Sequence, residues 1–91
     1  MKSVHVIVSG RVQGIGYRAW TAEQASLLGL GGWVRNRRDG TVEAVLSGAM
    51  DAVDDMIVRL HNGPIGARVD HLFTAEWDGP VPQGFSVLST E

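Results

Sequence analysis

A glycine-rich segment followed by an arginine is the part of this 91-residue chain best suited to chemistry. Gly10, Gly14 and Gly16 fall close together, and Arg18 follows two positions after the last of them. A loop of this kind that leads into a helix leaves several backbone N–H groups unpaired beside the positive end of the helix dipole. Such a concavity favours an anion. The segment Gly10–Gly16 therefore predicts an anion site.

Arg18 is the candidate charged partner for that anion. A cation at the start of a helix is disfavoured by the dipole by about 0.3–1 kcal/mol, unless something negative is present there. A planar guanidinium can make paired hydrogen bonds to two phosphate oxygens while the loop amides hold the others. A phosphoryl group would account for the arginine. The alternative is a solvated arginine that follows an ordinary tight turn.

Asn36 is the second candidate for chemistry. Its side-chain amide can both donate and accept hydrogen bonds, so it could hold a water molecule near a bound phosphate. The alternative is structural, because asparagine favours turns and the segment Asn36–Gly40 could be a hairpin loop that begins at Asn36.

Nucleotide binding is a competing interpretation of the same loop. Gly14–Ala19 fits the loose pattern G-x-G-x-x-A, and Asp39 lies about twenty residues beyond it. The context does not fit, because the expected helix leads into a hairpin and Asp39 belongs to the hairpin turn. The lysine of a phosphate-binding P-loop is also absent.

The first half of the chain predicts a strand, a helix and a hairpin around these residues. Alternating β-branched residues indicate a strand over Ser3–Ser9. A helix is expected from Tyr17 to about Leu30. Its apolar stripe would comprise Ala22, Ala25, Leu28 and Ala19, and Gly29, Gly31 and Gly32 would end it.

After that helix, Trp33–Asn36 and Thr41–Leu46 are expected to pair around the turn at Asp39-Gly40.

A second helix and two more strands complete the pattern. Apolar residues at helical spacing predict a helix that Asn62, Gly63 and Pro64 stop; these residues are Ala49, Val53, Met56, Ile57 and Leu60. Val69–Trp77 and the short segment Phe85–Leu88 are expected to be strands. The order βαββαβ with an additional short C-terminal strand predicts an α+β, ferredoxin-like split βαβ sandwich. Its antiparallel sheet would be covered on one face by two helices, in a single domain over 1–91.

Composition excludes several classes of function. A net charge of −2 and a pI near 5.8 give no overall attraction to nucleic acid or to anionic lipid, so neither is expected as a partner. The chain has no cysteine, which rules out disulfides and thiolate chemistry and favours the cytoplasm. The apolar start is too short for a signal peptide. The three histidines show no metal-ligand spacing, so no metal is expected.

Both candidate segments resemble the acylphosphatase family. The run from Val8 to Arg18, VSGRVQGIGYR, is similar to the family's phosphate loop, and Gly32–Asn36, GWVRN, is similar to its second motif. The match continues from Asp39 to Gly48 and again from Gly63 to Leu72. Only Ile15 and Tyr17 depart, where the family more often has valine and phenylalanine.

The resemblance implies a function and a role for each site residue. The chain would hydrolyse acyl phosphates by water attack, without metal or cofactor, and release inorganic phosphate, which would compete with substrate. Arg18 would bind the phosphate and Asn36 would orient the water. The loop backbone would hold the remaining phosphate oxygens through Gln13, Gly14, Ile15, Gly16 and Tyr17. A monomer is expected.

Two alternatives remain at the level of sequence. The first is a non-catalytic phosphate-binding or interaction module, because ferredoxin-like domains serve many functions. The second is a role like that of the acylphosphatase-like domain fused to carbamoyl-transfer proteins, against which the stand-alone length argues.

Overall fold

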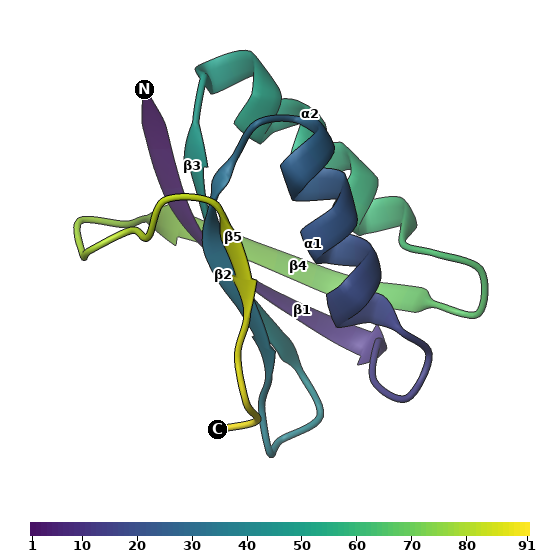
Figure 1. Cartoon of the computed structure of the whole chain (residues 1–91). Coiled ribbons are helices and arrows are strands. Elements are labelled where there is room, and N and C mark those ends of the chain that lie inside the picture. Colours follow the sequence, from purple (N-terminus) through teal and green to yellow (C-terminus); the bar gives the residue numbers. More distant parts are fainter.

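A computed structural model describes all residues, 1–91, and shows a five-stranded sheet with two helices on one face (Figure 1). The elements in chain order are β1 (Lys2–Arg11), α1 (Tyr17–Leu27), β2 (Gly31–Asn36), β3 (Val42–Gly48), α2 (Met50–Asn62), β4 (Arg68–Glu76) and β5 (Phe85–Val87). The strand order is β4-β1-β3-β2-β5. The expected ferredoxin-like arrangement with an additional C-terminal strand is confirmed.

The sheet is antiparallel except at one edge. β1 pairs antiparallel with β3 and β4, and β2 pairs antiparallel with β3. The short strand β5 instead runs parallel to β2. The chain continues past β5 along the same strand, because the N–H of Leu88 donates to Val34 O at 2.8 Å and the N–H of Glu91 to Asn36 O at 3.1 Å.

The core lies between the sheet and the helices. The alternation in β1 places Val4, Val6 and Val8 in the core, as the period of two requires. The central strand β3 differs, because all seven of its residues are buried. Its second face is therefore covered by neighbouring side chains and not by solvent.

The predicted buried stripe is confirmed in α2 and differs in α1. In α2, Val53, Met56 and Leu60 are buried as expected, while Ala49 precedes the helix as its exposed N-cap. In α1 the buried residues are Tyr17, Thr21 and Ala25. The predicted stripe was wrong at Ala19, which is exposed, and Ala22 is only half-buried, because the helix is rotated to bury Tyr17. Leu28 packs against the core as expected, but as the residue that follows the helix. Neither helix has the length and apolar character needed to cross a lipid bilayer.

The glycines near the end of α1 have a different role from the predicted one. The helix ends at Leu27, and Gly29 takes φ 71° in the turn that follows. Gly31 and Gly32 do not end the helix but belong to β2. A Cβ on Gly32 would lie 1.8 Å from Val45 O, so a side chain is excluded there by the neighbouring strand.

Gly10 also belongs to a strand, contrary to the predicted loop. It pairs with Val69 of β4, and Arg11 pairs with Arg68, after a bulge between Ser9 and Gly10. The phosphate-loop candidate therefore begins at Val12, and the bulge re-aims the strand end from which it leaves.

Candidate active site

One cavity brings the candidate residues together from three parts of the fold. Its volume is about 260 Å³. It lies where the loop after β1, the first turn of α1 and the ends of β2 and β5 meet. The lining residues are Val12, Gln13, Gly14, Gly16, Tyr17, Arg18, Ala19, Asn36 and Val87.

The loop between β1 and α1 has the backbone geometry of an anion site. Gly14 and Gly16 take φ values of 76° and 78°, in the left-handed region that only glycine adopts without strain. Gly16 is the N-cap of α1 and supplies no side-chain cap, and no acidic residue lies in the first turn. The first hydrogen bond of the helix runs from Trp20 N–H to Gly16 O at 3.0 Å. The N–H groups before Trp20 are therefore free to bind an anion.

Tyr17 anchors the start of the helix beneath this loop. Its ring is 1% exposed, and its hydroxyl donates to Leu60 O near the end of α2 at 2.7 Å. Burial raises the pKa of Tyr17, so the phenol stays protonated and serves as a donor. The ring of Trp20 packs on the same ring at a centroid distance of 5.5 Å. The C-terminal end of the loop is therefore held in place by the buried Tyr17 side chain.

Gln13 ties the loop to the hairpin that follows Asn36. Its Nε2 donates to Arg37 O at 2.8 Å and to Thr41 O at 2.9 Å. The loop and the end of β2 are therefore held in one geometry by a side chain, a role that the sequence did not indicate.

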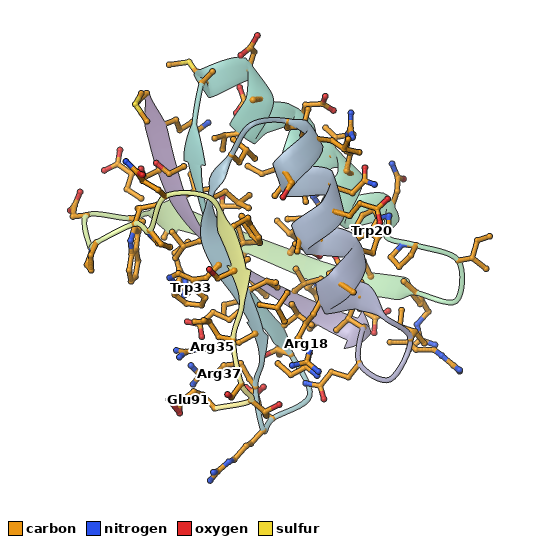
Figure 2. All side chains as sticks on the ribbon, viewed as in Figure 1. Arg18, Trp20, Trp33, Arg35, Arg37 and Glu91 are labelled. Atoms are coloured by element: carbon orange, nitrogen blue, oxygen red, sulfur yellow. The ribbon has the colours of Figure 1, made fainter.

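Arg18 is a cation without a carboxylate partner. Of the eight lysines and arginines, five form ion pairs with Asp or Glu, and the others are Arg11, Arg18 and Arg38. Arg11 and Arg38 are exposed, whereas Arg18 is partly covered and lines the cavity. Its Nη1 makes only a long contact of 3.4 Å to Leu88 O. Figure 2 shows it beneath the start of α1. A half-covered guanidinium with free donors is suited to an anion.

Asn36 is the polar side chain at the opposite wall. It is the last residue of β2, and its Oδ1 is buried without a hydrogen-bond partner. Its backbone is well held, because its carbonyl accepts from Glu91 N–H and it pairs across the ladder with Val42. A buried amide oxygen without a partner is costly, so this atom does not stabilise the fold and is left free to accept a hydrogen bond in the cavity.

A buried carboxylate lies on the other face of the sheet behind Asn36. Glu43 of β3 is 7% exposed and binds three groups. His5 Nε2 lies 2.6 Å from Oε2, while Arg35 Nε and Arg37 Nη1 donate to Oε1 at 2.7 and 3.0 Å. Burial alone would raise the pKa of Glu43, but these three hydrogen bonds outweigh it and lower that pKa to about 2.

The cavity contains six of the seven residues that the sequence proposed for the site. Ile15 does not line it and instead faces Gly66, where a Cβ would lie 3.7 Å from its Cγ2. Sequence reasoning missed Val12, Ala19 and Val87 as lining residues. Nothing in the sequence around Val87 indicated that it would line the cavity. It does so because β5 pairs with β2, and this pairing cannot be predicted from the residues of β5 alone. No cluster of three or more His, Cys, Asp or Glu side chains is placed to hold a metal ion.

Comparison with known proteins gives a consistent result. A family model described as acylphosphatase matches residues 4–87. A protein of Rhodopseudomonas palustris named acylphosphatase is 62% identical over 93% of this chain and 92% of its own length. One of Alcanivorax borkumensis with the same name is 50% identical, over 96% and 99%. The crystal structure of acylphosphatase from Bacillus subtilis superposes with a TM-score of 0.91 at 32% identity, over 97% and 99%.

Proposed function

The chain belongs to the acylphosphatase family, hydrolases that act on acyl phosphates, and we propose that its own Arg18, loop amides and Asn36 perform the hydrolysis. The substrate is a small acyl phosphate, and the products are a carboxylate and inorganic phosphate. The role proposed for each residue is the one that the resemblance to the family implies, and the geometry of the cavity supports it.

The phosphoryl group would be bound by the loop and by Arg18. The unpaired N–H groups of residues 13–17, near the positive end of α1, would each donate a hydrogen bond to a phosphate oxygen. Arg18 would donate two parallel hydrogen bonds to two oxygens. Phosphoryl transfer spreads negative charge over the equatorial oxygens, so donors fixed in advance stabilise the transition state.

The leaving group needs little help. A departing carboxylate is stable without protonation, so no strong general acid is required. The enzyme then has two tasks, which are to neutralise the phosphate and to align the water opposite the leaving oxygen. No histidine or carboxylate lines the cavity, and the proton of the water would pass to the phosphate itself.

Asn36 would align the attacking water. Neither atom of its side-chain amide is used by another protein group, and the side chain lines the same cavity as Arg18. The observation that carries the proposal is this pairing of an unpartnered cation with an unpartnered amide across one cavity. It favours hydrolysis over passive phosphate binding, which would need no water-binding group.

Hydrolysis of benzoyl phosphate in the presence of a chelator tests the proposal. We expect turnover by the wild type, inhibited competitively by inorganic phosphate. Arg18→Ala removes two charge-assisted hydrogen bonds of about 1.5–3 kcal/mol each, so kcat/KM should fall about 10²–10⁴-fold. The matched control is Arg38→Ala, which removes the same charge from an exposed arginine that lies outside the cavity.

Either of two results would overturn these assignments. A wild type without chelator-resistant turnover would favour a phosphate-binding module. Equal loss in the Arg18→Ala and Arg38→Ala variants would mean that net charge, and not the position of Arg18, determines activity. Circular dichroism on each variant separates these results from a loss of folding.

We also propose that the protein acts as a cytoplasmic monomer. The cation, the loop amides and the side-chain amide that the proposed reaction uses are all supplied by Arg18, residues 13–17 and Asn36, so the reaction requires no group from a second copy. The absence of cysteine suits a reducing compartment. Sedimentation equilibrium at assay concentration would test the monomer, and fractionation of cells of the source organism would test the compartment.

A further inference from the structure

Glu43 is the one buried carboxylate of the fold, and the hydrolysis described above does not use it. It lies on β3 opposite Arg35 of β2, on the face of the sheet that the helices leave open. Both of its oxygens have partners, His5 on Oε2 and the two arginines Arg35 and Arg37 on Oε1. Figure 2 shows Arg35 and Arg37 together at the end of β2, close to Glu91 and apart from Arg18.

The two arginines are the neighbours of Asn36 in sequence. Because side chains alternate along a strand, Arg35 points to the open face while Asn36 points to the cavity. Arg37 follows the strand, and its hydrogen bond to Glu43 places its guanidinium on the same open face. Both guanidinium groups donate to the same oxygen, Oε1 of Glu43. The carboxylate therefore fixes the backbone on both sides of Asn36, and with it the direction of the Asn36 Cα–Cβ bond.

These hydrogen bonds act at the end of β2, where the proposed role of Asn36 depends on the direction of its side chain. β2 ends at Asn36, and beyond it the backbone is held outside the β2–β3 ladder, where Arg38 N–H donates to Glu91 O at 3.0 Å. On the far side, Arg37 is held by its N–H to Thr41 O at 2.8 Å, by Gln13 and by the bond to Glu43. Of these three contacts of Arg37, the hydrogen bond to Glu43 is the one made to a residue of the adjacent strand β3.

We propose that Glu43 is a positioning residue for Asn36, holding the water-aligning amide in its productive direction through Arg35 and Arg37. This inference rests on the proposed role of Asn36. It assigns to a residue on the opposite face of the sheet an effect on kcat without an effect on phosphate binding, because neither the loop nor Arg18 contacts Glu43.

The test compares Glu43→Gln with the wild type in steady-state hydrolysis of benzoyl phosphate. A displacement of a positioning group by about 1 Å can cost up to about 10²-fold, so we expect kcat to fall about 10-fold or more. The inhibition constant of inorganic phosphate should stay within about twofold. Lys2→Ala is the matched control, because it breaks an ion pair with Asp54 that is exposed and remote from the cavity.

A second measurement separates positioning from general destabilisation. If Glu43 acts through Asn36, Glu43→Gln should change the residual kcat of an Asn36→Ala background by less than about twofold. A merely structural role would lower activity equally in both backgrounds. If Glu43→Gln does not fold, Arg37→Ala replaces it, since that variant removes one arm and leaves Glu43 bound by His5 and Arg35.

The outcomes distinguish this inference from the proposed function. An unchanged kcat in Glu43→Gln, with a large loss in Asn36→Ala, would overturn the positioning role alone. A fall in phosphate affinity equal to the fall in kcat would also overturn it. Full activity in Asn36→Ala would overturn both, because Glu43 would then have nothing to position.

Discussion

Acid should destabilise the fold through Glu43, and the size of the effect follows from its surroundings. The ordinary pKa of the carboxyl is 4.5, and in the fold it is lowered to about 2. A group with a lowered pKa in the folded state contributes stability that is complete above the unfolded value and is lost as the pH falls through the folded one. The loss should therefore occur between about pH 5 and about pH 2.

The magnitude comes from the pKa difference. At about 1.4 kcal/mol for each unit, the interval from 4.5 to about 2 corresponds to at most about 3–4 kcal/mol. The Glu43 side chain is only 9% exposed, so solvent screens the three partners little. For a domain whose total stability is of the order of 5–15 kcal/mol, this is a large share.

The assay is urea denaturation of the wild type and of Glu43→Gln at pH values from 7 to 2. The variant cannot ionise at this position, so the stability gap between the two proteins should be widest near neutral pH and should close as the pH falls. Other carboxyls titrate in both proteins and cancel in the difference. A gap that stays constant over the whole range would refute the reasoning, because it would show that the charge of Glu43 contributes nothing.

Two further substitutions test the supports of the loop and of β2. Tyr17→Phe leaves the buried Leu60 carbonyl without its side-chain donor and should lower the free energy of unfolding by about 1–3 kcal/mol. Urea denaturation measures this change. An unchanged midpoint would contradict the role of the Tyr17 hydroxyl in holding the start of α1. Gly32→Ala would force a Cβ to 1.8 Å from Val45 O, so we expect no cooperative thermal transition. A native-like transition in that variant would show that β2 and β3 can separate at this position.

The sequence was sufficient for the order of elements and for the location of the site. Strong periodicity in α2 and β1, together with glycines at the turns, determined the fold class. The interpretation of Gly31 and Gly32 as the end of a helix was wrong. Glycine is required there because the backbone of β2 lies close to neighbouring backbone atoms. Such an approach depends on strand pairing, which local composition does not reveal.

The sequence predicted which residues form the candidate site, but not the contacts that hold them in place. The motifs named Arg18 and Asn36, and the cavity contains both. The contacts of the Gln13 side chain, the pairing of β5 with β2 and the hydrogen bonds of Glu43 were not predictable, because each depends on which segments become neighbours in the folded sheet. Glu43 reads as the exposed residue of an alternating strand, and only the packing of β3 between β1 and β2 buries it.

The central claim is that Asn36 aligns water while the loop and Arg18 bind phosphate, and steady-state kinetics of Asn36→Ala test it most directly. With chelator present and benzoyl phosphate as substrate, we predict that kcat falls by about 10²-fold or more. The inhibition constant of inorganic phosphate should change by less than about twofold, because Asn36 is not part of the phosphate-binding loop. A variant that keeps its kcat, or that loses phosphate affinity in proportion to kcat, would contradict the account.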